Sequence, residues 1–167
     1  AQRGYVCVTG VHGIIESQRD NTLRKVHNRS LFTMPDGMPT VWMGREQGFV
    51  KMGRVYGPDL MLKMFEATSA QGTHPAFTHF LYGATKEMLD RMKHNLEERF
   101  PGVRIVGQYA PPFRPLNSAE EIELTAHVES VKPDFFWVGL STPKQEKFMD
   151  LYLNLSLVFA ALPLIMS

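Results

Sequence analysis

Thr33-Met-Pro-Asp-Gly-Met-Pro-Thr-Val-Trp42 is the stretch that decides the fold, because it joins a predicted strand to a predicted helix through a turn. Residues 31–34 are typical of a short buried strand, and Pro35 ends it because proline has no backbone N–H for a ladder. Gly37 permits the turn. Asp36 therefore lies at the carboxyl end of a strand, where ligands bind in open α/β sheets. Taken alone, this turn is explained more simply if Asp36 only caps the next helix.

The same order, a strand and then a helix, recurs on both sides of this stretch. Apolar, β-branched and aromatic runs predict strands, and apolar residues spaced three and four apart predict helices. The predicted strands are 5–9, 31–34, 77–82, 103–107 and 135–140; the predicted helices are 14–28, 38–47, 86–100 and 118–131, with two more that begin at Gly57-Pro58 and near Pro143. Residues 10–13 are predicted to be a loop, and Ser118 is predicted to cap its helix in a capping box with Glu121.

About five strand–helix repeats predict an α/β fold with a mainly parallel, Rossmann-like sheet of five or six strands and helices on both faces. Residues 1–152 are interpreted as one core domain, because no linker or internal repeat interrupts them. Residues 153–167 are an apolar tail, which Asn154 and Pro163 interrupt, so that it is too short to be a transmembrane helix. We expect this tail either to form a buried strand and turn or to dock on a partner or a membrane surface.

The composition is that of an ordinary globular domain, with 167 residues, 44% hydrophobic and 21% charged, and a net charge of +1. This charge balance gives no reason to expect a nucleic-acid partner. Cys7 is the single cysteine, which excludes an internal disulfide and a multi-cysteine zinc site, and its apolar neighbours indicate a buried thiol. No signal peptide is visible, and a strand begins almost at once, so we expect further residues upstream in the natural protein.

Four predicted strand ends carry residues that can bind a ligand. They are Thr9-Gly-Val-His12, Pro35-Asp-Gly37, Gly83-Ala-Thr85 and Gly139-Leu-Ser-Thr-Pro-Lys-Gln145. In a parallel sheet all four lie on one edge. The turn Gly83, Ala84 and Thr85 precedes a helix whose free N–H groups favour an anion such as phosphate, although tight packing explains a single glycine about as well.

Several side chains in these loops have a functional and an ordinary interpretation. Gly139, Thr142, Lys144 and Gln145 can contact a nucleotide or sugar, or they can be solvated residues of a first helical turn. His12 can be a base, a hydrogen-bonding residue or a packed loop residue. Arg54, further along the chain, can clamp a diphosphate or form a surface ion pair with Asp59. The sequence contains neither a dinucleotide fingerprint nor a phosphate loop, and no histidine pair at metal-ligand spacing.

Together, these motifs resemble the WecG/TagA/CpsF family of bacterial glycosyltransferases over about residues 4–150. The stretches that carry the resemblance are Tyr5-Val-Cys-Val-Thr-Gly-Val-His12, Arg19-Asp20, Pro35-Asp-Gly-Met-Pro-Thr-Val-Trp42, Arg54-Val-Tyr-Gly-Pro-Asp-Leu60, Phe80-Leu-Tyr-Gly-Ala84, Phe100-Pro-Gly-Val-Arg-Ile-Val-Gly107 and Val138-Gly-Leu-Ser-Thr-Pro-Lys-Gln-Glu-Lys147. Each motif alone is only weakly or moderately specific, whereas their order and spacing are specific for the family.

The resemblance implies transfer of an N-acetylmannosamine-type sugar from a UDP-sugar to a polyprenyl-diphosphate-linked acceptor, with inversion and without an essential metal or cofactor. It implies a cytoplasmic protein, peripheral to the inner face of the bacterial membrane, that serves synthesis of teichoic acid, common antigen or exopolysaccharide and can form a homo-oligomer. Asp36 matches the family's proposed base, and Arg54 matches an arginine near the diphosphate. Thr9, with His12 nearby, stands where some members have a strand-end Thr-x-Asn.

The chain also departs from the family pattern. Family members have a further strand and helix before Tyr5 and an arginine-rich appendage after the region of Gln145, where this chain has the apolar tail. We therefore expect a chain truncated at both ends, with little activity on its own, because the groups that stabilise a leaving diphosphate are fewer. The alternative is a non-catalytic α/β module that binds a nucleotide or sugar; a Rossmann-type oxidoreductase would need the missing glycine fingerprint.

Overall fold

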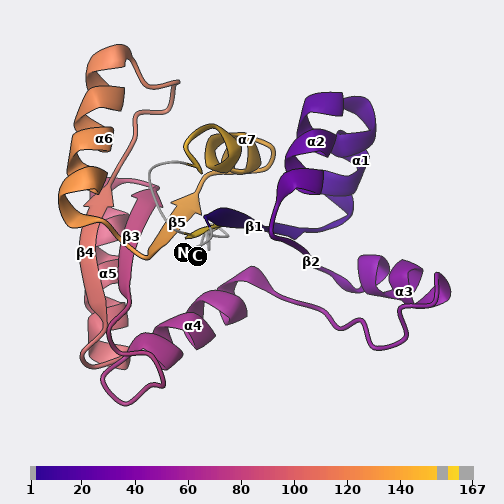
Figure 1. Ribbon diagram of the computed structural model, residues 1–167, viewed down its shortest axis with the longest axis horizontal. Coiled ribbons are helices and arrows are strands. Elements are labelled where there is room, and N and C mark those ends of the chain that lie inside the picture. The colour runs from indigo at the N-terminus through magenta and orange to yellow at the C-terminus, as the bar shows by residue number, and fades with distance from the viewer. Residues whose placement is uncertain (1–2, 154–157, 162–167) are drawn as a thin grey trace.

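The computed structural model describes residues 3–153 and 158–161. These residues contain the strands β1 (Gly4–Thr9), β2 (Phe32–Pro35), β3 (Thr78–Gly83), β4 (Arg104–Tyr109), β5 (Phe135–Gly139) and β6 (Val158–Ala161). The helices are α1 (Val11–Arg19), α2 (Asn21–Arg29), α3 (Met38–Glu46), α4 (Gly57–Thr68), α5 (Lys86–Arg99), α6 (Ser118–Val131) and α7 (Lys144–Leu151). Figure 1 shows these elements along the chain.

The six strands form one parallel sheet in the order β2-β1-β6-β5-β3-β4. The predicted Rossmann-like α/β fold is therefore confirmed. The chain runs outward from β1 to β2 on one side and from β3 to β4 on the other, so the direction of winding reverses near the centre of the sheet. Such a reversal is where open α/β sheets bind their ligands.

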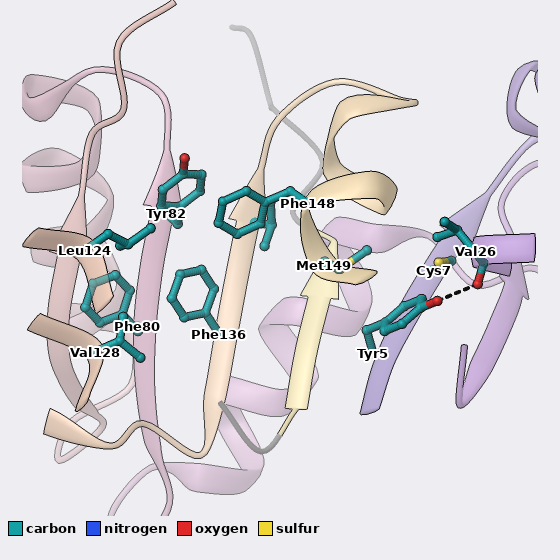
Figure 2. Close-up of a cluster of buried hydrophobic side chains, with 11 residues drawn as sticks. Tyr5, Cys7, Val26, Phe80, Tyr82, Leu124, Val128, Phe136, Phe148 and Met149 are labelled. Atoms are coloured by element: carbon teal, nitrogen blue, oxygen red, sulfur yellow. Dashed lines mark hydrogen bonds between the residues drawn. The ribbon is translucent and has the colours of Figure 1, made fainter. Parts of the chain in front are cut away.

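Alternate residues of the central strands enter two different hydrophobic cores. Phe80 and Phe136 lie in a core with residues of α2, α6 and α7, which Figure 2 shows. Leu81 and Trp137, the next residue of each strand, lie in a core with residues of α4 and α5. Because successive side chains of a strand point to opposite faces, this division means that helices cover both faces of the sheet. The prediction of helices on both faces is thus confirmed.

The tail contributes a strand to the sheet. β6 pairs with β1 on one side and with β5 on the other. Of the two expectations for the tail, a strand is therefore observed at 158–161. Residues 154–157 and 162–167 lie outside the described residues. Within the part of the chain that is described, no helix has both the length and the apolarity that a membrane span requires.

The region between β1 and β2 differs from the prediction. Residues 11–13 are the first turn of α1 instead of a loop, and the expected helix 14–28 is interrupted. At the interruption Asp20 has an extended backbone, and its carboxylate accepts hydrogen bonds from the N–H groups of Thr22 and Leu23. An aspartate that satisfies two free N–H groups is a strong helix start, which explains why α2 begins anew.

Two further predictions were wrong in detail. The strand β2 is not buried, since Phe32 and Thr33 are exposed; it is an edge strand that pairs only with β1 among the described strands. Asn117, not Ser118, caps α6. Its side chain accepts from the N–H of Glu120, whose carboxylate accepts from the N–H of Asn117. The capping box is thus shifted by one residue, because Asn117 is the last residue with an extended backbone.

Candidate active site

The four candidate loops lie at one edge of the sheet. Thr9, the last residue of β1, is in register with Pro35, and Gly83 of β3 is in register with Gly139 of β5. Because all strands are parallel, their carboxyl ends meet at this edge, as the sequence predicted. Asp36 follows β2 here, and its N–H donates to the carbonyl of Thr9 at 3.0 Å.

Asp36 is paired with Arg54. Nη2 of Arg54 lies 3.5 Å from Oδ1 of Asp36, and the two side chains are 45% and 31% exposed, respectively. The Arg54 guanidinium also lies over the ring of Tyr56, 4.7 Å from its centroid. The suggested ion pair with Asp59 is therefore replaced by one with Asp36. In addition, α3 has Gly37 at its N-cap without a side-chain cap bond, so the simpler interpretation of Asp36 as a helix cap is wrong.

Thr9 and Thr142 approach each other across the start of α1. A Cβ at Gly13 would lie 2.8 Å from Cγ2 of Thr9 and 3.8 Å from Cγ2 of Thr142. Glycine at this position therefore lets the first turn of α1 reach the ends of β1 and β5. Thr9 is buried, and its Oγ1 lies 3.4 Å from Nδ1 of His27. His12, by contrast, is exposed on the first turn of α1.

The turn after β3 is built by close backbone packing. Gly83 has a φ of +127°, and a Cβ there would lie 2.3 Å from the carbonyl oxygen of Gly139. Ala84 also has a positive φ, of 55°. Thr85 caps α5, and its Oγ1 accepts from the N–H of Met88 at 3.3 Å. Tight packing therefore accounts for Gly83, and the role of these three residues in binding phosphate stays a prediction.

The turn after β5 and the first turn of α7 share a buried hydrogen-bond network. The hydroxyl of Thr142 donates to Oε1 of Glu146 at 2.8 Å, and Nε2 of Gln145 donates to the same oxygen at 3.2 Å. Nε2 of Gln145 also lies 3.4 Å from Oγ1 of Thr142. Gln145 is 6% exposed and Glu146 1% exposed, whereas Lys144 is exposed to solvent. Gln145 is thus not a solvated first-turn residue.

Glu146 and His27 were not singled out from the sequence. Burial lowers the pKa of His27, and the negative charge of Glu146 partly opposes this shift. Helical spacing places both residues on a buried helix face: His27 follows the buried Leu23 by four residues, and Glu146 precedes the buried Met149 by three. A polar residue on the apolar face of a helix is either paired or functional.

Three buried atoms of these residues have no hydrogen-bond partner among the described residues: Oε1 of Gln145, Oε2 of Glu146 and Nε2 of His27. The described residues contain no cluster of three His, Cys, Asp or Glu side chains that could hold a metal ion. A cavity of about 600 Å³ lies elsewhere, between the carboxyl ends of α4 and α5, where Lys63 and Arg99 line it. That cavity is at the amino edge of the sheet, away from Asp36.

Comparisons with known proteins identify a family and several named relatives. The sequence model of the Glycosyl transferase WecG/TagA/CpsF family matches residues 1–161. Relatives from Bacillus subtilis (strain 168) and Bacillus spizizenii are both named N-acetylglucosaminyldiphosphoundecaprenol N-acetyl-beta-D-mannosaminyltransferase. They are 26% identical over 138 residues and 24% identical over 140 residues, which is 82% and 84% of this chain. A relative of the same name from Staphylococcus aureus is 27% identical over 75 residues, 45% of this chain and 28% of its own length.

The match covers 50% of the B. subtilis protein and 51% of the B. spizizenii protein, so the chain spans about half the length of these curated relatives. The family match, in contrast, extends over nearly the whole chain. It includes β1, β2 and the Asp36–Arg54 pair, as well as the turn between β5 and α7. The chain therefore belongs to the WecG/TagA/CpsF family of glycosyl transferases.

Proposed function

We propose that the chain is the core of an inverting glycosyltransferase that moves N-acetylmannosamine from a UDP-sugar to N-acetylglucosamine linked to undecaprenyl diphosphate. The names of the relatives support the transferred sugar and the acceptor. The observation that carries the proposal is the Asp36–Arg54 pair, which stands at the carboxyl edge of the sheet beside Thr9. A carboxylate next to a guanidinium is the combination that this reaction needs.

In the proposed reaction Asp36 takes the proton of the acceptor hydroxyl while the hydroxyl oxygen bonds to the anomeric carbon. The bond between that carbon and the UDP oxygen breaks, and UDP leaves with the electron pair. Attack from the face opposite UDP inverts the configuration. Arg54 has five N–H donors, so it can remain near Asp36 and still donate to the diphosphate. The N-terminus of α5, next to Thr85, adds N–H groups that favour the same negative charge.

The first prediction concerns donor binding and the base. UDP should bind the chain saturably below millimolar concentration in calorimetry. Asp36→Asn should bind UDP about as well as the wild type, but turnover should fall about 10²–10⁴-fold, because a general base contributes that much. Turnover is measured with UDP-N-acetylmannosamine and the lipid-linked acceptor, in the chain completed with the segments of the B. subtilis relative that lie outside the match.

The matched control is Asp59→Asn, because Asp59 is an exposed aspartate in the first turn of α4 and should not affect turnover. Near-normal turnover of Asp36→Asn would place the base elsewhere, with His12 as the next candidate. If UDP did not bind at all, the chain would have to be regarded as something other than a UDP-sugar enzyme.

We also propose that the protein acts at a membrane surface, since the acceptor in the relatives' names carries undecaprenol. The helix α3 and the loop after it support this location, because Trp42, Met43, Phe49 and Val50 are each more than half exposed. Arg45 and Lys51 lie in the same segment, and a mixture of exposed apolar and basic side chains is typical of segments that bind anionic lipid surfaces.

The second prediction follows from this surface. The double variant Trp42→Ser/Phe49→Ser should bind vesicles of anionic phospholipid at least about tenfold more weakly in co-sedimentation, because each buried large side chain contributes about 1.5–3 kcal/mol. The control is Phe113→Ser, which removes a phenylalanine that is 97% exposed on the loop before α6. Unchanged vesicle binding together with a loss of self-association in light scattering would instead assign this surface to a second copy of the chain.

A further inference from the structure

Glu146 is a buried carboxylate in which one oxygen accepts two hydrogen bonds from its neighbours. Thr142 donates its hydroxyl to Oε1 at 2.8 Å, and Gln145 donates Nε2 to the same oxygen at 3.2 Å. Thr142 lies in the turn after β5, and Gln145 and Glu146 lie in the first turn of α7, at the same sheet edge as Asp36. A buried charge with few partners is destabilising, so the neighbours of Glu146 at this edge need a physical account.

The carboxylate determines which way the Gln145 side chain points. A carboxylate can only accept hydrogen bonds, so a carboxamide beside it must present its NH₂ group. The Oε1 of Gln145 is thereby turned away from Glu146. The Thr142 hydroxyl is also occupied, because it donates to Glu146 and lies within 3.4 Å of Nε2 of Gln145 as an acceptor. Neither side chain keeps a free donor for a phosphate oxygen.

What remains is an acceptor. Oε1 of Gln145 is buried and has no hydrogen-bond partner among the described residues. A buried acceptor without a partner is destabilising, and a ligand that donates to it recovers this cost. An N–H or O–H group can donate to this oxygen, whereas an ionised phosphate oxygen can only accept. The charge of Glu146 nearby also disfavours an anion at this position.

We propose that Glu146 is a positioning residue, which orients Gln145 so that its Oε1 accepts a hydrogen bond from a neutral N–H or O–H group of the sugar nucleotide. This inference rests on the proposed function and makes it more specific. Gln145 contacts the neutral part of the sugar nucleotide, and Arg54 and the helix N-termini bind the diphosphate. The neutral group belongs either to the nucleoside or to the transferred sugar. UDP and the UDP-sugar both contain the nucleoside, whereas only the UDP-sugar contains the transferred sugar.

The test compares three ligands by calorimetry: inorganic diphosphate, UDP and UDP-N-acetylglucosamine. Glu146→Gln keeps the shape of the side chain but no longer forces the Gln145 amide into one orientation. It should weaken UDP-N-acetylglucosamine binding about tenfold, the equivalent of one hydrogen bond, and leave diphosphate binding unchanged. If UDP is weakened equally, the group lies in the nucleoside; if UDP is unaffected, it lies in the sugar. The control is Glu129→Gln, an exposed residue of α6 that should change none of these affinities.

A second measurement on the wild-type chain does not depend on how the variant folds. In proton-exchange NMR the side-chain NH₂ of Gln145 should exchange much more slowly than that of Gln18, which is exposed on α1. Exchange as fast as that of Gln18 would overturn the positioning role. Equal weakening of diphosphate, or no change for any ligand, would overturn the assignment of Gln145 as an acceptor. Slow exchange in a wild-type chain that binds no nucleotide would leave Glu146 as a positioning residue but reject both the ligand assigned here and the proposed function.

Discussion

His79 is a fully buried histidine on β3 whose two ring nitrogens both have partners. The indole N–H of Trp137 donates to Nδ1 at 3.0 Å, so Nδ1 is an acceptor and the proton must be on Nε2. Nε2 lies 2.7 Å from the hydroxyl of Thr68, which itself donates to the carbonyl of Met64 at 2.7 Å. The neutral ring therefore satisfies every bond, whereas a second proton would point at the Trp137 N–H.

The third prediction is a pH dependence of stability that originates in His79. Burial lowers the pKa of His79 to about 4, below the usual value of 6.5. Between these values the unfolded chain binds more protons than the folded one, so stability falls as the pH falls from about 6.5 to about 4. Over this pH range the free energy of unfolding should fall by an amount on the order of 3 kcal/mol because of this histidine.

Urea unfolding between pH 4.5 and 7.5 measures this effect. His79→Phe should flatten the pH dependence relative to the wild type, whatever its stability at pH 7.5. His94→Gln removes an exposed histidine of α5 and should leave the dependence unchanged. A curve for His79→Phe parallel to that of the wild type would show that His79 is not the titrating group.

At the scale of a single element, the start of α6 depends on one residue that local patterns misassign. The side chain of Asn117 accepts from the N–H of Glu120 at 3.0 Å, and Arg114 holds Glu120 from outside the helix through two contacts, at 2.7 and 2.8 Å. The ion pair with Arg114 lowers the pKa of Glu120 to about 2. The cap and the ion pair therefore share the same carboxylate.

The fourth prediction separates the two candidate caps. Asn117→Ala should lower the free energy of unfolding by about 1 kcal/mol, because it leaves an N–H of the first turn without a partner. Ser118→Ala should have almost no effect, since alanine is favourable inside a helix. Chemical denaturation of both variants at pH 7 measures the difference. A larger loss for Ser118→Ala would return the cap to the position that the sequence favoured.

At the scale of the whole molecule, the two tryptophans report on different parts of the fold. Trp137 is 1% exposed in the core beneath α4 and α5, and Trp42 is 57% exposed on α3. The helix α3 contacts β2, an edge strand, and it projects away from the rest of the sheet in Figure 1. A helix held at an edge has fewer packed neighbours than one that lies across the sheet, so we expect it to open more easily.

The fifth prediction uses this difference. In Trp42→Phe the remaining emission should be blue-shifted, resist iodide quenching and change only together with the circular dichroism during urea unfolding. In the wild type, part of the emission should be red-shifted and quenched by iodide, and should change at lower urea concentration. Identical quenching of the two proteins would mean that α3 is covered in solution, by a second copy or by another segment.

Much of the fold could be predicted from local patterns. The runs at 77–82 and 135–140 indicated buried strands, and spacings such as that of Leu89 and Leu96 indicated a helix that faces them. Strand and helix alternate along the chain, and that alternation requires parallel strands, which in turn brings the loops of Thr9, Asp36, Gly83 and Gly139 to one edge. These features are determined by residues that are close in sequence.

Other features depend on residues that are far apart in the sequence, and only the tertiary structure decides them. It places β6 between β1 and β5, which no local pattern indicates, because strand order depends on which faces pack together. It also pairs Arg54 with Asp36, 18 residues away, rather than with Asp59. Gln145 was open to interpretation as a solvated first-turn residue, but the approach of α7 to the sheet buries it together with Glu146. Spacing along the chain sets which face a side chain occupies, whereas packing decides what lies opposite that face.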